Sequence, residues 1–227
     1  MHTVPLLFAI GGGGATYGSD PDLERALLAL VEGPARVGYL GVASRDDPAR
    51  VAHVHATLGA LGGKVTHLAM DQPVADFAAE LPALDILYVG GGHTPGLVAH
   101  LRESGKGDAA IAAARRGLVL AGVSAGAVCW FEFGLFDRHG SGLEPLPALG
   151  LVPGCFCPHF DSDAERRAAF PLRIEAGQIP PGLAVDDGAA VIVRFGQCER
   201  VVSGRPGAGA YRLGADRSVT PLVRRRP

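Results

Sequence analysis

Lysine is almost missing from this chain of 227 residues, where Lys64 and Lys106 are the only two. Arginine therefore supplies nearly all of the positive charge. The charged fraction of 19% is below the roughly 25% typical of soluble proteins, and the formal net charge is −2. This balance excludes a strongly basic protein that coats phosphates, so we expect no nucleic-acid partner.

Long apolar runs are also absent. None reaches the roughly 18 residues that a membrane-spanning helix needs, and the apolar run near the N-terminus ends at Gly11, too early for a signal peptide. We therefore expect a cytoplasmic protein with no membrane partner.

Cysteine is scarce, with four residues and no C-x-x-C pair. This excludes a zinc ribbon and a thioredoxin motif, and we expect Cys155 and Cys157 to be free buried thiols. No cluster of His, Asp or Glu has the spacing of metal ligands, so no metal site is expected.

The first half of the chain alternates short apolar runs with helix-period segments, which is typical of β-α repeats and a parallel sheet covered on both faces. The length suits one α/β domain over residues 1–227. The pattern predicts strands over residues 6–10, 37–42, 65–70, 86–89 and 118–123, and helices over 21–31, 51–61, 95–102 and 108–115.

After about residue 130 the pattern changes to short strand-like pieces separated by Gly and Pro. Strands are predicted over residues 155–160, 183–185, 189–195, 200–203 and 210–213, and one helix over 163–174. We expect these pieces to extend the same sheet in an antiparallel manner.

The most specific motif is Gly122-Val123-Ser124-Ala125-Gly126, a G-x-S-x-G between an apolar strand and a predicted helix over 125–131. A nucleophile elbow needs this context, because small neighbours allow a sharp turn that exposes the serine hydroxyl. The alternative is a serine that caps a helix between two packing glycines. The position at the carboxyl end of a central strand favours the elbow.

A serine nucleophile needs a base, and His159 at the end of an apolar strand-like run is the best of the eight histidines. His93 and His139 lie in loops and are weaker candidates. The acid that orients the base is expected in the segment between Ser124 and His159, which favours Asp137 over Glu132.

Two glycine-rich loops follow predicted strands. In a serine hydrolase, backbone N–H groups of Gly91 or Gly92, with that of Ala125, would form the oxyanion hole. The alternative for residues 90–92 is a tight strand-to-helix turn. Residues 11–14 lack the last glycine of a dinucleotide fingerprint, and the P-loop lysine is absent, so no nucleotide cofactor is expected.

Three motifs together resemble the peptidase E family of serine peptidases, which is related to cyanophycinase. The motifs are Gly90-Gly91-Gly92-His93-Thr94, Gly122-Val123-Ser124-Ala125-Gly126-Ala127, and Ala148-Leu149-Gly150-Leu151-Val152-Pro153 followed by Cys157-Pro158-His159-Phe160. The likeness extends to about residue 195.

The resemblance implies a three-layer α/β sandwich of the flavodoxin-like or class I amidotransferase-like type, with a mainly parallel sheet and a β-rich C-terminal extension. It implies Ser124 as nucleophile, His159 as general base and Asp137 as acid, with Glu132 as the alternative acid, and Gly91 and Gly92 in the oxyanion hole. No cofactor is implied, and a homodimer is ordinary for such a family.

Peptidase E enzymes release an N-terminal aspartate, so the resemblance implies a small-peptide substrate, including Asp-X dipeptides. The substrate carboxylate needs a cation, for which Arg166 and Arg167 are candidates, with Arg138 a third. Two other functions stay open: a cyanophycinase-like hydrolase of β-aspartyl-arginine bonds, and an amidotransferase-like binding or stress-response module without turnover.

Overall fold

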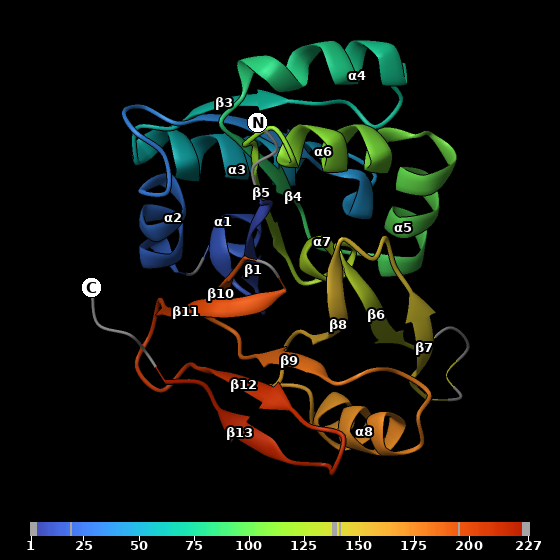
Figure 1. The fold of residues 1–227 in the computed structure, drawn as a ribbon. Helices are drawn as coiled ribbons and strands as arrows, with labels where there is room; N and C mark the ends of the chain where they lie inside the picture. Colours follow the sequence, from blue (N-terminus) through green and yellow to red (C-terminus); the bar gives the residue numbers. More distant parts are fainter. Residues whose placement is uncertain (1–3, 19, 138–139, 141, 195, 224–227) are drawn as a thin grey trace.

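The computed structural model describes residues 4–18, 20–137, 140, 142–194 and 196–223. A seven-stranded sheet forms the upper half of the molecule as drawn in Figure 1, in the order β11-β10-β1-β5-β4-β2-β3. Its parallel strands are β1 (Leu6–Ile10), β2 (Arg36–Leu40), β3 (Lys64–His67), β4 (Ile86–Val89) and β5 (Val119–Val123). Antiparallel strands β10 (Ala189–Arg194) and β11 (Gln197–Ser203) extend it beyond β1, as the sequence predicts.

Helices cover both faces of this sheet, because successive side chains of a strand point to opposite faces. Phe8 and Ile10 face one apolar cluster, with α2 (Pro21–Leu28) and α3 (Pro48–Ala60), while Leu7 and Ala9 face the other. That second face carries α4 (Val74–Glu80), α5 (Thr94–Glu103) and α6 (Lys106–Ala114). The expected three-layer α/β sandwich is confirmed.

The C-terminal half differs from the sequence-based expectation of a single extended sheet. Only β10 and β11 join the first sheet, while the other strands form a second sheet in the order β13-β12-β9-β8-β6-β7. The α8 helix (Ala164–Glu175) packs against it through Phe170 and Ile174. Its strands are β6 (Phe131–Phe136), β7 (Glu144–Pro147), β8 (Val152–Cys157), β9 (Gly182–Val185), β12 (Ala210–Leu213) and β13 (Val219–Pro221).

The predicted helix over 125–131 is wrong in its second half. The α7 helix covers only Ala125–Val128, and the chain then enters β6, which pairs in parallel with β8. Phe131 stacks on Phe156 of β8 with ring centroids 4.8 Å apart. This aromatic contact between neighbouring strands overrides the local helical pattern.

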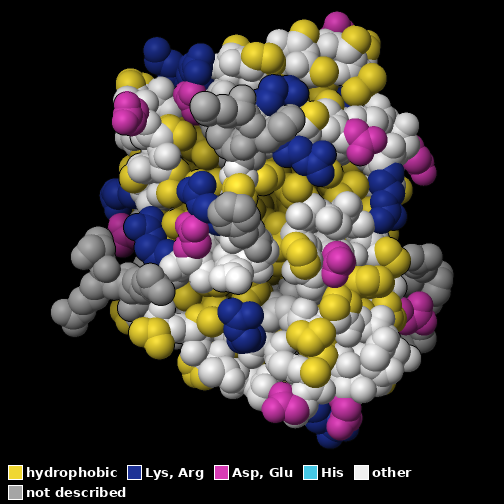
Figure 2. Space-filling view, in the orientation of Figure 1, with side chains coloured by type: hydrophobic (Ala, Val, Ile, Leu, Met, Phe, Trp, Pro, Cys, Tyr) yellow, Lys and Arg dark blue, Asp and Glu magenta, His cyan; other side chains and the backbone are white. Residues whose placement is uncertain are grey.

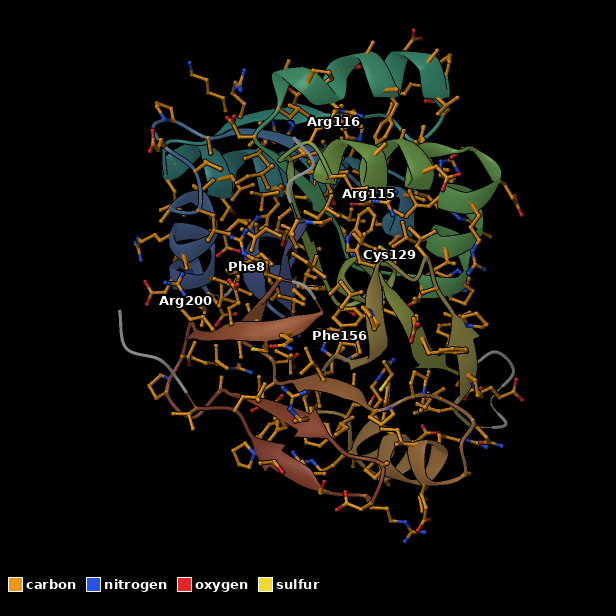
Figure 3. The ribbon with its side chains drawn as sticks, in the orientation of Figure 1. Phe8, Arg115, Arg116, Cys129, Phe156 and Arg200 are labelled. Atoms are coloured by element: carbon orange, nitrogen blue, oxygen red, sulfur yellow. The ribbon has the colours of Figure 1, made fainter. Side chains whose placement is uncertain are left out.

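The two sheets share one apolar core. The largest buried cluster combines first-sheet side chains such as Leu7 with Phe156 of β8 and Leu183 of β9. Figure 3 labels Cys129 and Phe156 from this cluster and Phe8 from the cluster beneath α2. Cys155 and Cys157 are free buried thiols, as expected.

The surface drawn in Figure 2 mixes acidic and basic side chains, and neither sign forms a continuous patch on this face. Within the described residues, no helix combines the length and the apolar character needed to cross a membrane.

Candidate active site

Ser124 occupies a sharp turn between β5 and α7. Its φ of 52° and ψ of −115° are values that a residue with a side chain rarely adopts. A Cβ at position 122 would overlap the carbonyl oxygen of Gly126, and one at position 126 would overlap that of Val89. The motif glycines are therefore needed so that α7 can pack directly on β4 and β5, which leaves Ser124 at the carboxyl end of the sheet.

His159 lies directly beside this serine. Its Nε2 atom is 2.8 Å from Ser124 Oγ, although the two residues are 35 positions apart in the chain. The β8 strand ends at Cys157, before Pro158, because proline has no N–H for a strand ladder. His159 follows in a turn with a φ of 56°, which directs the ring toward the serine.

The carboxylate that contacts His159 is Asp187. Its Oδ1 atom lies 2.5 Å from Nδ1 of His159. Because Nδ1 faces a carboxylate, the tautomer with its proton on Nδ1 makes this bond and leaves Nε2 free to accept the Ser124 proton. Ser124, His159 and Asp187 thus form a continuous hydrogen-bonded chain, in which the His159 and Asp187 side chains are 28% and 24% exposed.

Neither acid expected from the sequence contacts His159, so the expectation for Asp137 and Glu132 needs correction. Asp137 Oδ1 accepts the Gly140 N–H at 2.6 Å, after the end of β6, and Glu132 Oε2 accepts the Gly154 N–H at 2.8 Å. Both side chains therefore accept backbone N–H groups in or next to β6 and β8 of the second sheet.

The order of the three residues along the chain explains the wrong prediction. The sequence favours an acid between Ser124 and His159, whereas the carboxylate that contacts His159 lies 28 residues after it. Residues with this geometry occur in several chain orders in unrelated hydrolases. The pair Asp186-Asp187, placed between two short apolar strands and followed by Gly188, is the signal that could have identified the position.

Gly12, in the loop after β1, has no side chain and so leaves space for the His159 and Asp187 side chains. A Cβ at this position would overlap Asp187 Oδ1 and lie 2.6 Å from His159 Nδ1. Gly12 and Asp187 also form a parallel β-bridge, and the Gly188 N–H donates to Gly12 O at 2.9 Å. The backbone of the glycine-rich loop after β1 therefore packs directly against Asp187 and His159.

Asp187 is held by a network of further contacts. Ser162 Oγ donates to Asp187 Oδ2 at 2.7 Å, and the Asp187 N–H donates to Asp161 Oδ1 at 2.8 Å. Arg205 Nε donates to the Asp187 carbonyl at 2.9 Å and its Nη2 lies 3.4 Å from Asp161 Oδ2. Both carboxylate oxygens and both backbone groups of Asp187 are therefore bonded within the protein.

The neighbouring Asp186 has a different environment. Burial is the main cause that raises the pKa of its carboxyl above the usual value, and Asp161 adds to the increase. The N–H of Gly209 and the hydroxyl of Tyr211 donate to Asp186 Oδ2 and act in the opposite direction. Asp186 thus connects the active-site turn to the second sheet.

The loop after β4 also borders Ser124. A Cβ at Gly91 would lie 3.4 Å from Ser124 Cβ, and Gly92 has a φ of 147°, which favours glycine. Within the described residues, the backbone N–H groups of Gly91, Gly92 and Ala125 donate to no protein acceptor. These are the three N–H groups that the sequence predicts for an oxyanion hole.

The predicted substrate arginines have other partners. Arg166 pairs with Asp163 at 2.7 Å on the first turn of α8. Arg167 donates to the carbonyl oxygens of Phe160 and Asp161 and lies over the Phe160 ring. These contacts stabilise the segment that follows His159. Arg138 and the weaker base candidate His139 lie outside the described residues, as does His2.

His93, the other loop histidine, is a helix cap. Its Nδ1 accepts the Gly96 N–H at 3.1 Å at the start of α5, and its ring meets Phe136 edge-on. No group of three or more potential metal-ligating side chains occurs among the described residues.

The chain matches known proteins over most of its length. The profile of peptidase family S51 matches residues 7–201. The uncharacterized peptidase YgaJ of Bacillus subtilis (strain 168) is 36% identical over 213 residues, which cover 91% of each chain.

Two crystal structures share the fold. A peptidase from an acI-B1 Actinobacterium has a TM-score of 0.75 at 16% identity, covering 98% of this chain and 96% of its own. A candidate peptidase E protein from Listeria monocytogenes EGD-e has a TM-score of 0.66 at 20% identity, covering 88% of this chain and 98% of its own. With the family match over most of its length, the chain belongs to peptidase family S51 and is a serine-type peptidase.

Proposed function

We propose that this peptidase hydrolyses small peptides through an acyl-enzyme on Ser124, with His159 as general base and Asp187 as the acid that orients it. The observation that carries the proposal is the hydrogen-bonded chain of 2.8 Å from Ser124 Oγ to His159 and 2.5 Å from His159 to Asp187. A chain of this geometry activates a hydroxyl that is otherwise a weak nucleophile.

In the first half of the reaction, His159 Nε2 takes the hydroxyl proton while Ser124 Oγ bonds to the scissile carbonyl carbon. The carbonyl oxygen becomes an oxyanion, which the N–H groups of Ala125 and of Gly91 or Gly92 would stabilise. The His159 imidazolium then returns the proton to the leaving amine as the C–N bond breaks. Asp187 stabilises the imidazolium and keeps the ring in place.

In the second half, His159 takes a proton from a water molecule, and the water oxygen bonds to the acyl carbon. The C–O bond to Ser124 breaks and the serine recovers its proton from His159. No cofactor takes part in this sequence, since each proton transfer uses His159.

The proposed reaction belongs to one domain that covers residues 1–227, because the largest buried cluster takes side chains from both sheets. We place the protein in the cytoplasm, where free thiols such as Cys155 and Cys157 persist. The proposed substrates are short peptides, including Asp-X dipeptides.

The test is release of free aspartate from an α-Asp-Leu dipeptide, with labelling by a fluorophosphonate probe measured in parallel. We expect turnover and labelling by the unmodified protein and loss of both in Ser124→Ala. Ser218→Ala, in the turn before β13, is the matched control that should keep both.

The outcomes separate the alternatives. Turnover of β-Asp-Arg without turnover of α-Asp-Leu would replace the dipeptidase assignment by a cyanophycinase-like one. Labelling and turnover that persist in Ser124→Ala would overturn the proposed nucleophile, and a protein with neither activity would favour the binding module.

A further inference from the structure

Asp186 joins the segment that carries Asp187 to the second sheet. It follows the end of β9 at Val185 and immediately precedes Asp187. Its backbone N–H donates to the carbonyl oxygen of Gly209 at 3.0 Å, and its Oδ2 atom accepts the Gly209 N–H at 2.9 Å. The hydroxyl of Tyr211 donates to the same Oδ2 atom at 3.2 Å. Asp186 is therefore bonded to the start of β12 through both its backbone and its side chain.

The Asp186 carboxyl is shielded from water. The residue is 2% exposed, and its Oδ1 atom is buried without a hydrogen-bond partner among the described residues. Within that part of the chain, no lysine or arginine forms an ion pair with Asp186. Burial of such a group costs free energy, while its hydrogen bonds make the local structure rigid and specific. The carboxyl is therefore better suited to fixing a backbone than to adding stability.

Tyr211 connects the same carboxyl to the segment that carries the base. Its ring lies against the ring of Phe160, with the centroids 5.1 Å apart. Phe160 directly follows His159, and its N–H donates to the carbonyl oxygen of Val185 at 3.2 Å. The guanidinium of Arg167 lies over the Phe160 ring, 5.3 Å from the centroid. A shift of the turn that carries His159 would therefore disturb the contact with Tyr211.

The segment before Asp187 also packs against the loop after β1. A Cβ at Gly11 would overlap the carbonyl oxygens of Val185 and Asp186. On β12, Ala210 pairs with Val185 of β9, and these two strands lie side by side in Figure 1. The backbone that leads to Asp187 thus contacts both the loop after β1 and β12, and Asp186 makes its polar contacts with β12.

We propose that Asp186 and Tyr211 are positioning residues of the reaction, which hold the His159–Asp187 pair in its hydrogen-bonded geometry. The inference rests on the proposed function. Asp186 acts through the backbone of Asp187, and Tyr211 acts through Phe160, the residue after His159. The carboxyl and the phenol connect the acid and the base to one strand, so the distance between the two catalytic side chains depends on β12.

Variants of Asp186 separate anchoring from charge. Asp186→Ala removes the acceptor, and we expect kcat on α-Asp-Leu to fall by about 100-fold, as for a displacement of about 1 Å at the reacting groups. Asp186→Asn keeps an oxygen that accepts from Gly209 and Tyr211 but has no charge, so it should keep kcat close to that of the unmodified protein. KM should not change in either variant, because the residue acts through the His159–Asp187 pair.

Tyr211→Phe keeps the decision open if Asp186→Ala fails to fold. It retains the ring against Phe160 and loses only the hydroxyl, so kcat should fall by about three- to tenfold, as for loss of one hydrogen bond. Asp216→Ala is the matched control, since Asp216 Oδ1 accepts the Ser218 N–H at 3.1 Å in the turn between β12 and β13. This variant should keep both kcat and KM.

Proton NMR provides a readout that does not depend on turnover. The proton in the short bond between His159 Nδ1 and Asp187 should give a resonance at low field, which is identified by its loss in Asp187→Asn. We expect this resonance to weaken and move to higher field in Asp186→Ala and Tyr211→Phe. It should stay unchanged in Asp216→Ala.

The outcomes distinguish the inference from the proposed function. Unchanged kcat and an unchanged resonance in Asp186→Ala and Tyr211→Phe would overturn the positioning role. Equal losses in Asp186→Asn and Asp186→Ala would also overturn it, because the effect would then belong to charge. Absence of both turnover and fluorophosphonate labelling in the unmodified protein would contradict the proposed function, and the resonance would still decide whether Asp186 and Tyr211 hold the pair.

Discussion

The two sides of Ser124 differ in how the protein uses its polar groups. On the side of the second sheet, His159 contacts Asp187, and all four hydrogen-bonding groups of Asp187 have protein partners. On the side of β4, the N–H groups of Gly91 and Gly92 have no acceptor among the described residues.

We infer that the first side orients His159 and that the second side binds the substrate. A base must hold one geometry through the reaction, so its partners belong to the protein and are present before substrate arrives. Donors that stabilise an oxyanion or bind a carboxylate must stay available until the substrate comes. The second sheet and Gly12 of the loop after β1 therefore form the fixed side of the site, and the loop after β4 forms the receptive side.

The largest effect is expected from Asp187→Asn. The amide cannot hold His159 in the required tautomer, and we expect kcat to fall by about 10⁴-fold, as in other serine hydrolases. Asp137→Asn is the matched control and should keep its activity, measured as initial rates on the same dipeptide. A large loss in Asp137→Asn with full activity in Asp187→Asn would restore the acid expected from the sequence.

A smaller loss is expected from Gly12→Ala, which pushes a methyl group into the space of Asp187 Oδ1 and His159 Nδ1. Displacement of the pair by about 1 Å should lower kcat by about 100-fold. Gly59→Ala, on α3 with no atoms within 4 Å of the added methyl, is the control. Normal kcat in Gly12→Ala would show that the reaction tolerates displacement of the His159–Asp187 pair.

Ser162→Ala removes one donor to the Asp187 carboxylate and leaves the bond to His159 in place. Loss of one charge-assisted hydrogen bond corresponds to about a tenfold decrease in kcat, with KM unchanged because Ser162 acts through Asp187. Steady-state kinetics check this separation. Ser104→Ala, whose hydroxyl bonds a carbonyl of α5, is the control. An effect on KM alone would contradict a positioning role.

A buried carboxyl lies at the start of α1 (Gly14–Tyr17), directly after the loop that carries Gly12. Glu24 is 1% exposed and accepts the N–H of Ala15. Burial is the main cause that raises the pKa of Glu24 from 4.5 to about 7. The folded chain therefore retains this proton over an interval in which the unfolded chain has lost it.

Stability contributed by this group is complete below pH 4.5, falls as the pH rises toward 7, and stays low above that value. Glu24→Gln keeps an acceptor for Ala15 and carries no charge, so it should raise the thermal midpoint at pH 8 by about 5 °C and leave pH 4 unchanged. Thermal unfolding at both pH values measures this. Glu32→Gln, an exposed residue, is the control, and an equal rise at both pH values would contradict the buried-carboxyl explanation.

Local patterns in the first half predicted most of what was found there. Residues 6–10 and 86–89 form strands as expected, because buried parallel strands read as continuous apolar runs. Ser124 and His159 were also identified locally, one from its glycine neighbours and the other from its place after a strand. The distance of 2.8 Å between them agrees with that prediction.

The carboxylate that contacts His159 was not predictable in this way. Asp187 meets His159 only because β9 lies beside β8 in a second sheet, and no local pattern distinguished those strands from an extension of the first sheet.

The sequence by itself determined the β-α order of the first half, the sharp turn at Ser124 and the place of His159 after a strand, since each depends on residues close together in the chain. Tertiary structure alone decided which carboxylate contacts His159. That contact depends on the pairing of strands over long separations, where several acids offer the same chemistry and only position in space distinguishes them.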